Sequence, residues 1–222
     1  MKNKILIAAG LFVSAYFLKS CSNADNNTSK TDMDSSMSNM AQNDSMGSGK
    51  MAMNNEMMNS MNASMDKMKA VKMNGDFDAE YAGMMIEHHQ GAIDIANIEL
   101  KSGSDNTMKT MAQNIINSQT EEINKLKTIL TTHKENIVKG EHPELTEAMS
   151  NMAAKMNETK MTGNTDKDFA MMMKVHHSGA IEMSKGELGD GKVYELKKMA
   201  QQIITDQSKE ITEFTTWLSN QK

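Results

Sequence analysis

Apolar residues recur at intervals of three and four over much of the C-terminal two thirds of the chain. This spacing places them on one face of an α-helix. We predict four long helices, over residues 77–100, 106–132, 166–187 and 192–219. Gly103 lies in the turn between the first two helices, and Gly189 and Gly191 lie in the turn between the last two. The pattern therefore predicts two helical hairpins.

The two hairpins are copies of each other at a constant offset of 88 residues. Residues 81–100, YAGMMIEHHQGAIDIANIEL, align without a gap with residues 169–188, FAMMMKVHHSGAIEMSKGEL. Such a repeat indicates a duplicated structural unit. Two hairpins pack most simply as a four-helix bundle. We predict an all-α, ferritin-like four-helix bundle over residues 76–222, with hairpins 76–132 and 166–219.

The remaining segments have different compositions. The connection 133–165 contains Pro143, which is placed to begin a further helix along an edge of the bundle. Residues 21–75 are mostly Ser, Asn, Asp, Lys and Met, so they bury too little surface to offset the entropy of ordering. We expect a flexible, disordered Met-rich tether there, with a transient or ligand-induced helix over residues 54–72.

Residues 1–20 predict a lipoprotein signal peptide. An apolar run over residues 5–18 follows two lysines and is shorter than the roughly 20 residues that span a bilayer as a helix. Leu18-Lys19-Ser20-Cys21 is similar to a lipobox, where bacterial lipoproteins are cleaved and lipidated. We expect lipidation of Cys21 and a lipid anchor in the cell envelope, with Ser22 favouring the periplasmic face of the outer membrane. The alternative is an uncleaved membrane anchor.

Composition narrows the function classes. The 222 residues carry a net charge of −5, one proline, one cysteine and no arginine. A single proline is typical of a helical protein. Without arginine the chain lacks the planar side chain that binds phosphate bidentately, so we exclude nucleic acid as a partner. The single cysteine allows no internal disulfide.

Polar residues interrupt the apolar helix faces at matching places in both hairpins. A buried polar group without a partner costs several kcal/mol, so these groups are expected to pair or to bind a ligand. One interpretation is a hydrogen-bonded network in which the first histidine of each pair donates to a glutamate. The other is a metal site. The residues are His88, His89, Gln119, Glu122, His176, His177, Gln207 and Glu210.

Methionine beside each histidine pair favours the metal interpretation. Met85 and Met173 stand one helical turn before the first histidine, so sulfur and imidazole share a side of the helix. Met84 and Met172 join them as candidate ligands. Thioether sulfur is a poor ligand for Mg²⁺ or Ca²⁺ and a good one for Cu(I), and imidazole binds both copper states. We predict copper, with Cu(I) preferred and Cu(II) as the second option. The glutamines and glutamates would surround these ligands.

Methionine is abundant elsewhere, with 26 in the chain. Five in the tether have helical spacing, and because a tether has no core to fill, we interpret them as weak copper sites, with compositional drift as the alternative: Met57, Met58, Met61, Met65 and Met68. In the bundle, core packing is the favoured role of six: Met108, Met111, Met171, Met172, Met183 and Met199. His133 and His142 lack repeat partners and are expected in solvent.

The repeated motif resembles a known family. Met85-Ile86-Glu87-His88-His89-Gln90-Gly91-Ala92-Ile93 and its second copy, residues 173–181, are similar to the paired-histidine signature of the ferritin-like domain of unknown function 305. The resemblance covers residues 76–218. It implies a helical, exported, methionine-rich protein and copper binding through Met and His, as described for some periplasmic members. Glu87 and Val175 stand where the family commonly has proline.

These observations predict a copper-binding envelope lipoprotein that sequesters or passes on copper and is not an enzyme. A protein partner for copper transfer and a homodimer stay open. One alternative is a di-iron carboxylate oxidase using Glu99, Glu122, Glu187 and Glu210, which is disfavoured because Met-x-x-His-His replaces the Glu-x-x-His motif of such bundles. The other is a metal-free envelope interaction module.

Overall fold

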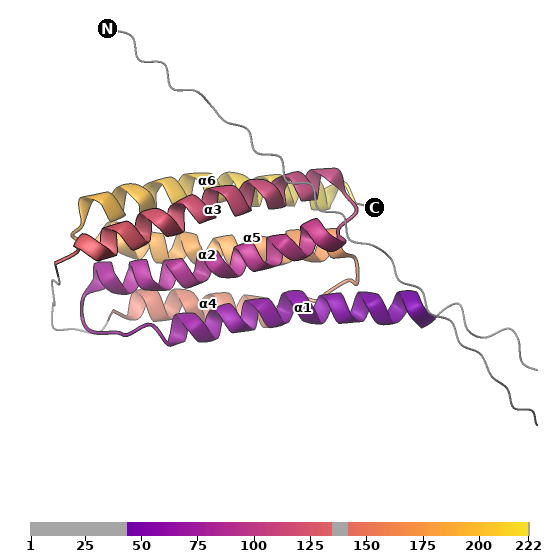
Figure 1. Ribbon diagram of the computed structural model, residues 1–222, viewed down its shortest axis with the longest axis horizontal. Helices are drawn as coiled ribbons and strands as arrows, with labels where there is room; N and C mark the ends of the chain where they lie inside the picture. Colours follow the sequence, from indigo (N-terminus) through magenta and orange to yellow (C-terminus); the bar gives the residue numbers. More distant parts are fainter. Residues whose placement is uncertain (1–43, 135–141, 222) are drawn as a thin grey trace, which may run out of the picture. The chain divides into compact units, whose positions relative to one another are not determined.

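The computed structural model describes residues 44–134 and 142–221, with side chains from residue 56 onward. These residues form six α-helices and no strand (Figure 1). The helices are α1 (Asp44–Lys69), α2 (Phe77–Ser102), α3 (Asn106–Thr132), α4 (Pro143–Glu158), α5 (Thr165–Asp190) and α6 (Tyr194–Ser219). The prediction of an all-α fold is confirmed for this part of the chain.

The helix ends follow from local sequence. The Asp76 carboxylate accepts a hydrogen bond from Ala79 N at the start of α2, and Asn164 does the same for Lys167 N at the start of α5. Such caps satisfy amide groups that have no partner inside the helix. Pro143 begins α4, as predicted. The four helices of the two hairpins are α2, α3, α5 and α6.

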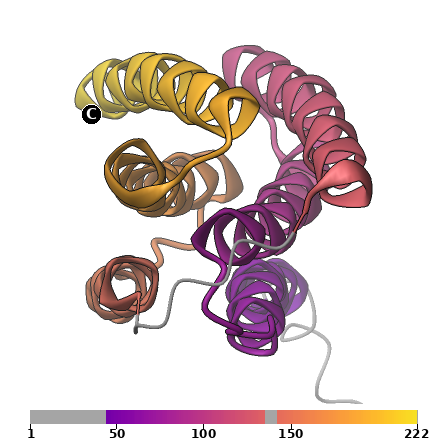
Figure 2. The same ribbon diagram turned by 90° about the vertical axis from the view of Figure 1, so that its left-hand side faces the viewer.

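The six helices form two matching stacks of three. Figure 2 shows α2 and α5 side by side, each covered on one side by the other helix of its hairpin. On its opposite side α2 packs against α1, and α5 packs against α4. The contacts between α3 and α6 are sparse. The central pair α2 and α5 therefore carries most of the contact between the two stacks.

The ordered helix α1 corrects the expectation of a flexible segment for its described part. Met57, Met61, Met65 and Met68 are buried and belong to the common core. They follow one face of the helix, and the unbranched thioether side chain adapts to irregular gaps between helices. The tether composition was misleading because methionine supplies the apolar surface that branched residues usually provide.

The repeat extends upstream to include α1 and α4. At the same offset, Lys72-Met73-Asn74-Gly75 corresponds to Lys160-Met161-Thr162-Gly163, and the two glycines have similar positive φ angles of 89° and 84°. Met61 and Met68 of α1 correspond to Met149 and Met156 of α4. The repeated unit is therefore a set of three helices, of which the sequence analysis recognised two.

In each repeated unit, an aspartate side chain accepts hydrogen bonds from a turn of the other unit. The Asp78 carboxylate, in α2, accepts hydrogen bonds from the amides of Lys192 and Val193, before α6. Asp166, in α5, accepts hydrogen bonds from the amides of Ser104 and Asp105, before α3, at 2.8 Å each. These residues also correspond at the offset of 88. The two units are thus joined reciprocally at both ends of the α2 and α5 pair.

The predicted signal peptide, the lipidation site Cys21 and the start of the tether lie outside the described residues. None of the described helices has the length and hydropathy required to span a membrane.

Candidate metal centre

Four histidines lie where α2 and α5 meet. His88, His89, His176 and His177 are all 0% exposed. The rings of His88 and His176 face each other across the two helices, with centroids 3.7 Å apart and planes inclined by 41°. The prediction that imidazoles from both hairpins converge in the helical core is confirmed for this pair.

His88 and His176 are buried without hydrogen bonds. Neither ring nitrogen of either residue makes a hydrogen bond of good geometry within the described chain, although each ring interacts weakly with the backbone of the other histidine. Burial, followed by the neighbouring histidines, holds the pKa of both side chains well below the ordinary value. Both rings are therefore neutral at pH 7, and each keeps a nitrogen lone pair free to bind a cation.

The second histidine of each pair contacts a glutamate. His89 Nε2 lies 2.8 Å from Glu122 Oε2, and His177 Nε2 lies 2.7 Å from Glu210 Oε2. Neither contact has the geometry of a hydrogen bond. The hydrogen-bonded network predicted from the sequence paired these glutamates with His88 and His176, and that pairing is wrong. His89 is thus directed to α3, and His177 is directed to α6.

Two glycines allow the close approach of helices at the histidines. A Cβ atom at Gly91 would lie 2.6 Å from Ser64 Cβ of α1 and 3.5 Å from His176 Nε2. A Cβ atom at Gly179, the repeat counterpart of Gly91, would lie 2.7 Å from Met152 Sδ of α4. Packing therefore requires glycine at position 91, whereas at position 179 the closest atom belongs to the end of a flexible side chain that can move.

The methionines predicted as ligands beside the histidine pairs are all in the core. Met84, Met85, Met172 and Met173 are fully buried or nearly so. Among the described residues no three His, Cys, Asp or Glu side chains form a preformed metal site. A centre based on the facing histidines therefore requires sulfur or water as additional ligands. For Met57, Met61, Met65 and Met68, burial in α1 supplies the packing role that the sequence analysis had excluded. Met58 is partly buried.

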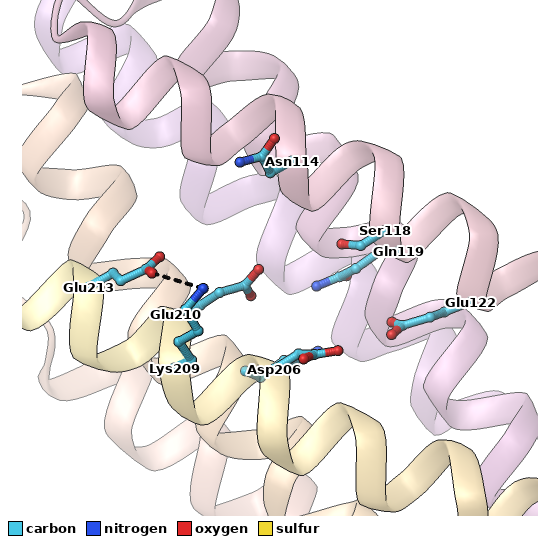
Figure 3. Close-up of a pocket in the computed structure, with 9 residues that line it drawn as sticks. Asn114, Ser118, Gln119, Glu122, Asp206, Lys209, Glu210 and Glu213 are labelled. Carbon is cyan, nitrogen blue, oxygen red and sulfur yellow. Dashed lines mark ion pairs between the residues drawn. The ribbon is translucent and has the colours of Figure 1, made fainter.

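A groove lies between α3 and α6 (Figure 3), and two of its lining residues, Glu122 and Glu210, contact His89 and His177. It has a volume of about 180 Å³. All four polar residues predicted to surround the metal line it. The full lining is Asn114, Ser118, Gln119, Glu122, Asp206, Gln207, Lys209, Glu210 and Glu213. The structure thus places Glu122 and Glu210 between the buried histidines and solvent.

Several polar residues were missed or misplaced by the sequence analysis. His133 is not free in solvent, because its Nε2 contacts Asp76 Oδ2 at 2.8 Å. The ring of His142 packs edge-on against Phe77 at 5.0 Å. Glu99 and Glu187, which the sequence suggested only as ligands in the di-iron alternative, are fully buried beside the turns that end α2 and α5 and do not line the groove with Glu122 and Glu210.

Sequence comparison decides the family. The family model described as domain of unknown function (DUF305) matches residues 18–130 and 78–218. The chain belongs to this family. The comparison with curated proteins found no match. The DUF305 chain is nevertheless similar to solved structures of CopM.

The matches to CopM cover about two thirds of this chain. One, "CopM in the Ag-bound form (by soaking)", has 28% sequence identity and a TM-score of 0.52, and the match covers 67% of this chain and 98% of CopM. Another, "CopM in the Cu(II)-bound form", has 28% identity and a TM-score of 0.50, with coverage of 65% and 98%.

Proposed function

We propose that this DUF305 protein binds copper through the buried histidines and the methionines beside them, and that it sequesters copper or passes it on. The observation that carries the proposal is the pair His88 and His176, whose four ring nitrogens are buried without hydrogen bonds. Leaving such groups unpaired costs about 1–3 kcal/mol each, and a bound cation would offset that cost.

The choice of copper rests on ligand chemistry and on the relatives. Imidazole and thioether together favour Cu(I), and Ag(I) is a similarly soft monovalent cation. CopM, at 28% identity, is described in Ag-bound and Cu(II)-bound forms. We propose Cu(I) as the preferred ion, with Met85 and Met173 as the first sulfur ligands and Met84 and Met172 as further ones.

We further propose that the α2, α3, α5 and α6 helices act as a ferritin-like four-helix bundle that holds the site. The protein would be exported, lipidated at Cys21 and anchored at the periplasmic face of the outer membrane. It would pass copper to a partner protein and would catalyse no reaction, and a homodimer is compatible with this role. A di-iron oxidase is not proposed, because the described residues contain no cluster of three or more His, Cys, Asp or Glu ligands.

The test replaces the facing histidines by leucine, which has no ligand atom. In an anaerobic Cu(I) competition titration, H88L/H176L is expected to bind at least about 100-fold more weakly than wild type, a difference of about 2.7 kcal/mol. The metal-free variant is expected to be more stable than wild type, because leucine leaves no buried nitrogen unpaired. Urea unfolding measures that second effect.

His142→Leu is the matched control, because this histidine lies beside Phe77, away from the facing pair. It should leave Cu(I) affinity unchanged. Wild-type affinity in H88L/H176L would reject the site. A loss of stability in the metal-free double variant would instead support a structural histidine network.

A further inference from the structure

The groove between α3 and α6 has a strongly acidic lining. It contains four carboxylates and a single cation, Lys209, whose ammonium group contacts Glu213 Oε1 at 3.5 Å. Figure 3 shows Glu122 extending from α3 and Glu210 from α6, on opposite walls. The negative potential of such a groove attracts cations from solvent.

Buried amides without partners also line the groove. Gln119 and Gln207 are 2% and 3% exposed. Gln119 Oε1 and both polar atoms of the Gln207 side chain have no hydrogen-bond partner in the described chain. Because an unpaired buried amide is costly, these oxygens point to a ligand in addition to the acidic residues around them.

The contact between each second histidine and its glutamate has the dimensions of a chelating pair. Two ligand atoms at about 2.0–2.1 Å from one ion, and at right angles to each other, lie about 2.9 Å apart. The observed separations are 2.8 Å for His89 Nε2 and Glu122 Oε2, and 2.7 Å for His177 Nε2 and Glu210 Oε2. Since neither histidine nitrogen has a hydrogen-bond partner, each is available to a cation together with the glutamate oxygen that it contacts.

The two ligands of each pair differ in access to solvent. The histidine side chains are 0% exposed, whereas the side chains of Glu122 and Glu210 are 16% and 22% exposed. A cation arriving through the groove therefore meets carboxylate oxygen first and imidazole nitrogen second. Water or the glutamine oxygens would fill its remaining positions, since each pair supplies only two ligands.

We propose that His89–Glu122 and His177–Glu210 form two equivalent nitrogen and oxygen sites for divalent copper, reached through the α3 and α6 groove. This inference rests on the proposed copper function and separates two kinds of site. Tetragonal nitrogen and oxygen ligands suit Cu(II), whereas thioether sulfur suits Cu(I). The groove pairs would hold Cu(II), while the facing histidines His88 and His176 would hold the softer ion.

The experiment compares Cu(II) with Ag(I) on the full chain. Glu122→Gln and Glu210→Gln keep the side-chain shape and remove the charged oxygen. The double variant is expected to lose at least tenfold in Cu(II) affinity, followed by electron paramagnetic resonance, and to keep its Ag(I) affinity within twofold. Each single variant should lose one of two Cu(II) equivalents, so the singles carry the test where the double variant does not fold.

The matched control is E121Q/E195Q, which removes the same charge from exposed positions of α3 and α6 outside the groove. It should bind both ions as wild type does. Unchanged Cu(II) affinity in E122Q/E210Q would overturn the inference. Equal losses of Cu(II) and Ag(I) would also overturn it, because the glutamates would then only hold the histidines in place. Wild-type protein that binds no Ag(I) or Cu(I) would instead reject the proposed copper function itself.

Discussion

The two repeats agree closely in their histidine and glutamate contacts and differ in how the central helix packs against the outer helix. The histidine to glutamate distances are 2.8 Å in one repeat and 2.7 Å in the other. At the outer contact, however, Ser64 of α1 faces Gly91, and Met152 of α4 faces Gly179. The contacts between histidine and glutamate are thus the same in both repeats, whereas the contacts between the central helix and the outer helix differ.

The difference shows how each outer helix is held. Ser64 Oγ donates a hydrogen bond to the backbone oxygen of Glu87 at 2.9 Å, so α1 approaches the backbone of α2 directly. On the other side a flexible thioether fills the space between α4 and α5. The α1 contact is therefore short and rigid, and the α4 contact is adaptable.

The largest expected difference between the repeats comes from adding one methyl group. Gly91→Ala should destabilise the protein by about 1–3 kcal/mol, because Ser64 Cβ is fixed to the α1 backbone and the helix must move. Gly179→Ala should lie within about 1 kcal/mol of wild type, because the end of Met152 can turn away and alanine favours the helix. Urea unfolding of both variants measures this difference. Equal effects would remove the distinction between the two contacts.

The stability of the two repeats is expected to depend differently on pH, because each has a buried glutamate beside the turn between its hairpin helices. Burial and then the Asp166 carboxylate raise the pKa of Glu99 to about 8, and burial and then Asp78 raise that of Glu187 to about 9, from an ordinary value of 4.5. The neutral carboxyls therefore contribute stability fully below pH 4.5, and this contribution is lost as pH rises through 8 and 9.

Glutamine mimics the neutral carboxyl, so each substitution should remove its own part of that loss. The melting temperature of wild type should fall between pH 6 and pH 9.5 by roughly 2–4 °C for each carboxyl. E99Q should reduce the fall up to about pH 8, and E187Q should reduce it up to about pH 9. Exposed Glu121→Gln serves as the control. A wild-type melting temperature that is constant over this range would contradict the assignment.

The smallest effect concerns a surface ion pair found in the second repeat. Lys155 of α4 contacts Glu182 of α5 at 2.9 Å, whereas Asp94, the counterpart of Glu182, accepts a hydrogen bond from Gln90 of its own helix. Lys155→Ala should cost less than about 0.5 kcal/mol, because both side chains are partly exposed. Lys67→Ala, at the counterpart position, should cost nothing measurable. A loss above 1 kcal/mol by urea unfolding would show that the ion pair holds α4 in place.

Sequence periodicity was sufficient to predict the bounds of the four hairpin helices. It was insufficient to predict which helices pack against one another. The bounds of α2, α3, α5 and α6 agree with the predicted ranges within three residues, because strong apolar stripes, capping residues and glycine turns specify them locally. The α1 helix was predicted only as transient, because its apolar face is methionine in a background of Asn, Ser and Lys. Its stability comes from packing on α2, which a local pattern does not contain.

The candidate centre shows the same limit. The duplicated histidine pairs identified the right residues, but helical spacing alone could not tell which ring of each pair faces the other hairpin. That choice depends on how α2 and α5 pack against each other, which involves contacts between residues distant in sequence, such as His88 and His176. The groove depends in the same way on the separation of α3 and α6.

Because Asp78 and Asp166 each bind a turn of the other repeat, the two halves of the chain are expected to assemble as separate fragments. A chain cut in the connection between α3 and α4 would leave each fragment with an aspartate whose amide donors lie on the other fragment. Fragment complementation would therefore assemble both ends and the facing imidazoles in a single association step.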